Sequence, residues 1–283
     1  MPAPDEREDI PPWPMWSVPA GIGVGLGIWI ITSVVVAAVA LAVGSSISHP
    51  SPGISLAQDV LSDLSFVSGA LILTVVMSRA RPAHFGYRRV WPALGVGAFA
   101  VAAISYYVIS LVYASIVKLH GSDKLPSELG ATHSTAALVG ATIFVCVVAP
   151  IAEEFFFRGF IFGGLRRMHV VVGGMDVGTW VAAAITGVLF GIVHAGSASS
   201  QYLIPLGIFG FVLCLLRWRT GSLYPCMALH SVNNALALGV NQLGWNAAEI
   251  IGLMLASLAV IALSTWPLAV PPLSFARKPT ART

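Results

Sequence analysis

Long apolar runs are the feature that most constrains what this chain can fold into. A helix rises about 1.5 Å per residue, so about 20 apolar residues cross the roughly 30 Å of hydrocarbon in a bilayer. We count eight such runs in the 283 residues, of which 57% are hydrophobic. They cover about residues 17–43, 57–78, 92–117, 139–165, 179–198, 202–217, 221–241 and 246–266. The pattern predicts an all-α integral membrane bundle of about eight transmembrane helices.

The distribution of basic residues predicts the orientation of the bundle. Loops rich in Lys and Arg stay in the cytoplasm. With eight helices, twelve of the fifteen basic residues fall on one side, Lys118 and Lys124 fall on the other, and Arg158 lies within a helix. We therefore expect a multi-pass protein of the plasma (inner) membrane, with the polar tails 1–16 and 267–283 in the cytoplasm. The formal charge of +3 arises from the loops and gives no case for binding nucleic acid.

Polar and charged side chains interrupt three of the predicted helices. A charge at the centre of a bilayer costs about 2.5–3.5 kcal/mol on insertion scales, so such residues are expected to serve a function or to pair. The interruptions are PIAEEFFFR from 150 to 158, FGIVH ending at His194, and HSVNN from His230 to Asn234. One buried cluster explains three polar patches on separate helices better than three unrelated sites do.

The two adjacent glutamates are predicted to differ in role. Glu154 and Arg158 are four residues apart and share a helix face, so we expect an ion pair between them. Glu153 is rotated by about 100° from Glu154 and points elsewhere, where it can take a proton. A plain salt bridge at the membrane boundary is the structural alternative. Arg166 and Arg167 argue against it. If they mark the cytoplasmic end of this helix, Glu153 lies about 20 Å from that end, inside the membrane.

The histidine patches also have structural alternatives. Phe190 and His194 share a helix face, as do His230 and Asn234. A lone histidine in an apolar helix is more often a core residue bonded to a backbone carbonyl, and His with Asn can be a contact between helices. Taken together, however, a carboxylate and a histidine can activate water, while Asn and His can donate to an oxyanion. This set suits peptide hydrolysis, and neither a Ser or Cys nucleophile with a partnered base nor H-E-x-x-H is evident.

The motifs EE-x-x-x-R, F-x-x-x-H and H-x-x-x-N, in this order on successive apolar helices, resemble a known family. It is the CAAX protease and bacteriocin-processing (CPBP, or Abi) family of intramembrane proteases, which includes the Rce1-type prenyl-protein endopeptidases. The resembling region is about residues 135–245. It would form a catalytic core between the N-terminal transmembrane helices at 17–134, which match nothing we can assign, and the last helix at 246–266.

The resemblance implies a role for each motif residue. Glu153 would activate water together with His194, while His230 and Asn234 would help to bind the oxyanion. The supporting residues would be Glu154, Arg158, Phe190 and Asn233. The partners implied are membrane lipids and a peptide or lipidated protein substrate. Prenylated CAAX proteins are the family's eponymous substrates, but nothing in the sequence calls for prenylation here, and the oligomeric state is not predicted.

The candidate residues are compatible both with a metal site and with a metal-free site. The family has been described both as metalloproteases and as metal-independent glutamate proteases, and Glu153, His194 and His230 could bind Zn²⁺ with one position free. The fourth candidate residue, Asn234, is an asparagine, which suits the binding of an oxyanion better than that of zinc. We therefore expect no cofactor.

Two other classes of function are weighed against the protease. A transporter would use Glu153 and the histidines as a proton relay, but it should show repeats, whereas the polar residues are concentrated in the C-terminal half. A non-catalytic membrane scaffold or immunity protein is disfavoured by the intact motif set. Asp59 and Asp63, near the start of the second predicted helix, are expected at the outer interface and not in the site.

Overall fold

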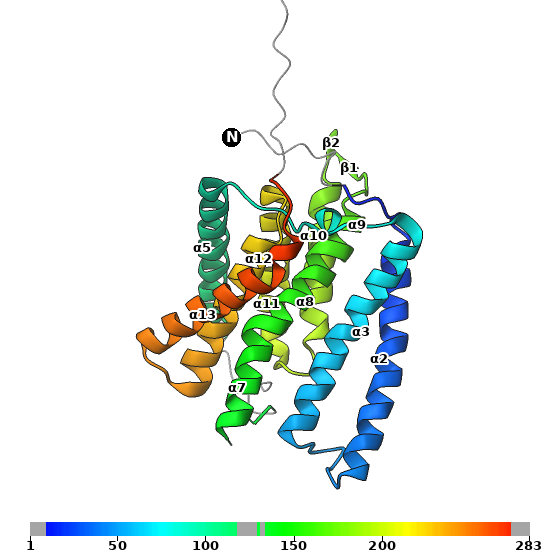
Figure 1. Cartoon of the computed structure of the whole chain (residues 1–283). Helices are drawn as coiled ribbons and strands as arrows, with labels where there is room; N and C mark the ends of the chain where they lie inside the picture. Colours follow the sequence, from blue (N-terminus) through cyan, green and yellow to red (C-terminus); the bar gives the residue numbers. More distant parts are fainter. Residues whose placement is uncertain (1–9, 118–128, 131–133, 273–283) are drawn as a thin grey trace, which may run out of the picture.

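The computed structural model describes residues 10–117, 129–130 and 134–272, which form a helical bundle (Figure 1). Six helices in this described part are long and apolar enough to cross a membrane. They are α2 (Ser17–Ala42), α3 (Pro52–Ser78), α5 (Pro92–Ile116), the composite span Thr135–Leu165, α11 (Ser200–Thr220), and α13 (Ala247–Thr265) with its 3₁₀ extension η4 (Trp266–Leu268). The predicted class, an all-α membrane bundle, is confirmed.

The two remaining predicted segments are also helices. α10 (Gly178–Val193) is a shorter apolar helix, and α12 (Tyr224–Leu236) continues as the π-helix η3 (Ala237–Leu243). Two predicted ends were wrong by five residues. α3 begins at Pro52 instead of 57, because proline is favoured at the first position of a helix. α10 ends at Val193 instead of 198, where the glycine and serines of AGSAS favour turns.

The composite span Thr135–Leu165 is the central element of the bundle (Figure 1). It alternates α and π geometry, which is rare in helices and frequent at functional sites. Its segments are α7 (Thr135–Ile143), η1 (Phe144–Val148), α8 (Ala149–Glu153), η2 (Glu154–Phe162) and α9 (Gly163–Leu165). Every residue of η2 is buried, so this part of the span is surrounded by the other helices.

Pro150 accounts for part of this irregular geometry. It has no N–H group, so the helix lacks the donor that would bond Cys146 O in α geometry, four residues earlier, or Val145 O in π geometry, five residues earlier. Side chains of α12 supply donors instead. Ser231 Oγ donates to Cys146 O at 2.7 Å, and Asn234 Nδ2 donates to Val145 O at 2.8 Å. These two bonds set the register of α12 against the span that carries the glutamates.

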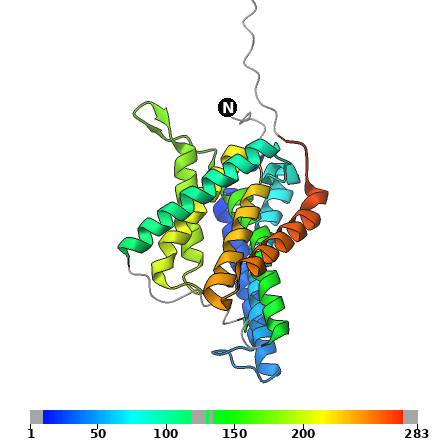
Figure 2. The same cartoon turned by 90° about the vertical axis from the view of Figure 1, so that its left-hand side faces the viewer.

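Close backbone contact joins α3 to α2. A Cβ atom on Gly69 would lie 2.6 Å from Gly21 O and 2.5 Å from Gly25 N, so only glycine fits at this crossing. On its other side α3 packs against α8 and η2. The α2–α3 pair therefore stands beside the central span (Figures 1 and 2).

One end of the bundle gathers the basic loops that the structure describes (Figures 1 and 2). α2 begins and α13 ends there, beside α4 (Pro82–Phe85) and the antiparallel hairpin of β1 (Val171–Val172) and β2 (Met175–Asp176). Of the predicted tails, residues 1–9 and 273–283 lie outside the described residues, as do Lys118 and Lys124. The rest of the N-terminal tail is packed: Trp13 is fully buried and stacks on Phe85 with ring centroids 4.7 Å apart.

Candidate active site

A buried ion pair lies at the centre of the bundle. Arg158 Nη1 donates to Glu154 Oε1 at 2.9 Å, and both side chains have no exposed surface. The expected pair between these residues is therefore present. Arg158 Nη2 also donates to Gly210 O at 3.3 Å, which links the pair to α11. Because a buried charge without a partner is costly, each of these two side chains compensates the charge of the other.

His230 connects the two glutamates. Its Nδ1 lies 2.8 Å from Glu154 Oε1 and its Nε2 lies 3.9 Å from Glu153 Oε2. An ionised carboxylate only accepts hydrogen bonds, so the Nδ1–H group donates to Glu154. The orientation of the ring is fixed by this bond, and Nε2 faces the carboxyl group of Glu153.

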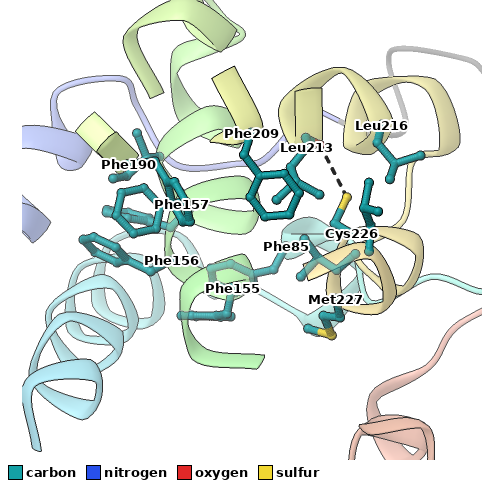
Figure 3. Close-up of a cluster of buried hydrophobic side chains, with 14 of the residues drawn as sticks. Phe85, Phe155, Phe156, Phe157, Phe190, Phe209, Leu213, Leu216, Cys226 and Met227 are labelled. Carbon is teal, nitrogen blue, oxygen red and sulfur yellow. Dashed lines mark hydrogen bonds between the residues drawn. The ribbon is translucent and has the colours of Figure 1, made fainter. Parts of the chain in front are cut away.

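Aromatic side chains enclose these polar groups. Figure 3 shows the phenylalanines of η2 gathered with Phe190 of α10 and Phe209 of α11. The guanidinium carbon of Arg158 stands 4.3 Å from the centre of the Phe190 ring, a cation–π contact. The rings of Phe190 and Phe209 pack edge-on against His230, with centroids 5.8 Å and 5.7 Å away. Water is thereby kept from the ion pair, which strengthens its electrostatic interactions.

His194 occupies the C-cap of α10 instead of the helix interior. Its Nδ1 lies 2.7 Å from Phe190 O, and since a carbonyl only accepts, Nδ1 carries the proton. In the neutral form of the ring, the lone pair is then on Nε2. In the described structure no hydrogen bond or ion pair joins His194 to Glu153 or His230. The ring of Phe190 stands between the two histidines and contacts both.

The two asparagines of α12 have different partners. Asn234 uses one N–H of its side-chain amide on Val145 O, which leaves the second N–H for another acceptor. Asn233 Oδ1 accepts a bond of 3.4 Å from the hydroxyl group of Tyr107 on α5. Asn233 therefore links α12 to α5, and Asn234 lies on the side of the central span.

Glu153 has no such set of partners. Its side chain is 18% exposed, and its buried Oε2 atom has no hydrogen-bond partner in the described structure. One residue along the helix, Glu154 is fully enclosed by Arg158 and His230. Glu153 is thus the carboxyl group of the site that remains open to a further ligand.

The arrangement does not assemble a zinc site. Among the described residues, no three His, Cys, Asp or Glu side chains come together as a group that could hold a metal ion. His230 turns one nitrogen to Glu154, and His194 does not join it at Glu153. The ligand set Glu153, His194 and His230 is therefore not formed in this conformation, and we derive no step through a metal.

Several residues of the site were not found from the sequence. The hydrogen bond from Ser231 to the carbonyl of Cys146 could have been expected, because a proline inside an apolar span leaves a carbonyl without its helical donor. No pattern in the sequence marks Phe209 or the carbonyl of Gly210 as part of the site. Asp63 was expected at the outer interface near the start of its helix, but α3 begins eleven residues before it and its Oδ2 atom is buried.

Comparisons with known proteins relate the middle of the chain to a described family. A family model described as Type II CAAX prenyl endopeptidase Rce1-like matches residues 135–236. An uncharacterised 24.3 kDa protein of Escherichia coli is 26% identical over 160 residues, which are 54% of this chain and 71% of that protein. The UPF0177 protein YxdF of Lactococcus lactis is 23% identical over 174 residues, 59% of this chain and 82% of its own. No solved structure matches the chain.

The matched residues include the whole central span and all of α10, α11 and α12. These are the elements that carry Glu153, Glu154, Arg158, His194 and His230. This part of the chain, residues 135–236, is therefore similar to the Rce1-like CAAX endopeptidases, which supports the resemblance that the motifs suggested.

Proposed function

We propose that this chain is an intramembrane endopeptidase that hydrolyses peptide bonds of membrane-associated proteins or peptides with water activated by Glu153. One observation carries the proposal. The ring of His230 is held by Glu154 at 2.8 Å and turns Nε2 to the unpaired carboxyl group of Glu153 at 3.9 Å. A base and a donor thus meet at one point inside a membrane bundle, which is what hydrolysis of a peptide bond requires.

The reaction uses the carboxylate of Glu153 as general base. Water gives one proton to Glu153 as its oxygen bonds to the carbonyl carbon of the substrate, and the carbonyl π electrons move to the oxygen. When this oxyanion collapses, the C–N bond breaks and Glu153 returns the proton to the leaving amine. His194, with its lone pair on Nε2, is the second acceptor that orients the water.

Charge balance supports a donor role for His230. Two glutamates and one arginine leave the cluster with one net negative charge, which is unfavourable in an apolar interior. A protonated His230 cancels that charge and carries N–H groups on both ring nitrogens. The Nε2–H then faces the space beside Glu153 where the oxyanion forms, with the second N–H of Asn234 as a further donor. Removing one such donor typically costs about 2.7–4 kcal/mol of transition-state stabilisation.

The orientation proposed is cytoplasmic for the basic end of the bundle. The excess of Lys and Arg in its loops supports this, since such loops stay in the cytoplasm. Because α2 begins and α13 ends at this end, both termini would be cytoplasmic in the plasma membrane. Membrane lipids and a peptide or lipidated protein are then the partners of the site.

Comparison of protein termini in membrane fractions tests the function. Cells carrying the wild type or Glu153→Gln would be labelled at free amino termini and analysed by mass spectrometry. New termini within or beside membrane segments should occur with the wild type and be absent with the variant. Identical sets of termini in the two strains, at equal enzyme levels, would argue against proteolysis.

Chelation tests the mechanism separately. With a substrate found in this way, purified protein in detergent should keep its turnover after exhaustive chelation, and metal analysis should find far less than one zinc per chain. Turnover that is lost on chelation and restored by zinc would replace water activation by Glu153 alone with a metal mechanism.

A further inference from the structure

Asp63 stands deep in α3 on the side of the central span. α3 begins at Pro52, so Asp63 lies eleven residues, or about 16 Å, along the helix. The helix packs directly against α8 and η2, which carry the two glutamates. The Oδ2 atom of Asp63 is buried and has no hydrogen-bond partner in the described structure. A buried carboxyl oxygen without a partner needs an explanation.

Glu153 is the charged neighbour that α3 meets across this contact. Three residues further along each helix, the rings of Phe66 on α3 and Phe156 on η2 lie 5.3 Å apart, so Asp63 and Glu153 lie at the same level of this contact. Glu153 in turn faces Nε2 of His230 on α12. The Oε2 atom of Glu153 is likewise buried without a hydrogen-bond partner in the described structure. Two unsatisfied carboxyl oxygens therefore stand on packed helices at the same site.

We infer that Asp63 is a second carboxyl group of the active site, which binds the hydrolytic water together with Glu153. This inference rests on the function proposed above. One polar molecule that bridges the two oxygens would satisfy both, and water is the smallest that can. A metal ion is the other ligand that paired carboxyl groups take, but no group of three metal-binding side chains forms among the described residues.

The two carboxyl groups carry one proton between them. Two carboxylates side by side in an apolar interior repel each other, so in this inference the O–H group of Asp63 is the donor and the carboxylate of Glu153 is the base. The water then donates to Glu153 and to His194 and accepts from the O–H of Asp63. One lone pair remains for attack on the carbonyl carbon. Asp63 keeps its proton throughout, so the proton balance of the reaction is unchanged.

A cavity one helical turn from Asp63 offers this water a route. The cavity has a volume of about 270 Å³ and lies between α2 and α3, where Asp59, Gln58, Ser55 and Ser33 line it. Asp59 is one helical turn from Asp63 on the same face of α3. Water in the cavity therefore comes within one turn of the carboxyl pair.

Three substitutions test the inference with turnover by the purified full chain. Asp63→Asn keeps a hydrogen-bond donor but removes the ionisable carboxyl group, and it should lower kcat on the order of 10-fold. Asp63→Leu has no hydrogen-bond donor and should lower kcat on the order of 10²-fold or more. KM should stay near the wild-type value in both. Asp59→Asn, the same change one turn away, should stay within about 3-fold of wild type, since Asp59 does not touch the water.

The pH profile and the carboxyl vibration separate catalysis from structure. The wild-type rate should fall at high pH as Asp63 loses its proton. This limb should disappear in Asp63→Asn, whereas Asp59→Asn removes only a charge one turn away and should shift the limb without abolishing it. Infrared spectra of the same proteins should lose one protonated carboxyl band in Asp63→Asn alone. This spectrum needs no substrate, so it tests the shared proton even where no cleavage is found. Wild-type kcat, pH profile and infrared bands in Asp63→Asn, beside an inactive Glu153→Gln, would overturn the inference and leave the proposed function standing.

Discussion

Glu153 and Glu154 are adjacent in the chain and meet opposite environments. Glu154 is fully buried between Arg158 and His230, and Arg158 is further held by the carbonyl of Gly210. Glu153 is 18% exposed and keeps a buried oxygen without a partner in the described structure. The comparison separates two uses of a carboxylate inside a membrane protein. A fully partnered one joins helices, and a partly partnered one is available to bind and react.

The largest effect that tests this comparison is on stability. Glu154→Ala should lower the free energy of unfolding by about 3–5 kcal/mol, because it leaves the guanidinium of Arg158 buried without its counter-charge. The measurement is thermal unfolding of the purified protein in detergent. Glu153→Gln is the matched control and should melt with the wild type. The reverse pattern, an unstable Glu153→Gln and a stable Glu154→Ala, would exchange the two roles.

A smaller effect is expected where α12 meets the central span. Ser231→Ala should cost about 1–3 kcal/mol, because the carbonyl of Cys146, already without a donor from Pro150, loses the bond from Ser231 Oγ. Ser264→Ala removes a hydroxyl that bonds only to a carbonyl within its own helix and should cost less. The two melting temperatures decide the matter. Equal losses of stability would show that the bond from Ser231 to Cys146 contributes no more than a bond within one helix.

The smallest effect concerns an exposed counterpart of the buried pair. His169 and Asp176 lie 2.7 Å apart at the β hairpin, with side chains 86% and 46% exposed. The hydrogen bond from His169, followed by those from the backbone N–H groups of Gly178 and Val170, lowers the pKa of Asp176. Any stability from this lowering is present above the unfolded pKa, near 3.8, and is lost as the pH falls through the lowered folded pKa.

Asp176→Asn should therefore leave the melting temperature at neutral pH unchanged within error, because exposed ion pairs are screened by water and salt. Melting curves with and without added salt measure this. A loss as large as that in Glu154→Ala would mean that burial is not what separates the two pairs.

Much of the fold could be predicted because membrane helices follow from the length of apolar runs. The pair of Glu154 with Arg158 followed from spacing within one helix. The contact of His230 with both glutamates could not be derived in this way, because it depends on how far α12 slides along the central span. Pro150 and the two hydrogen bonds from α12 set that position.

Helix ends explain the remaining differences. Asp63 was expected near a membrane surface because its helix was started at 57, whereas α3 begins at Pro52 and the contact of Phe66 with Phe156 places Asp63 at the level of Glu153. His194 was expected within a helix, but α10 stops at Val193 and the histidine caps it. Apolar runs locate a span well and its last turn poorly, since turn-forming residues such as Gly196 and Ser197 are also found inside membrane helices.

Turnover by purified Glu153→Gln, measured beside its melting temperature, tests the central claim most directly. The substrate would be a membrane protein whose new termini appear only with the wild type. We predict that the variant melts with the wild type and that its turnover falls on the order of 10²-fold or more, because the amide cannot take the proton of the water. A correctly folded Glu153→Gln protein that cleaves at the wild-type rate would contradict the account.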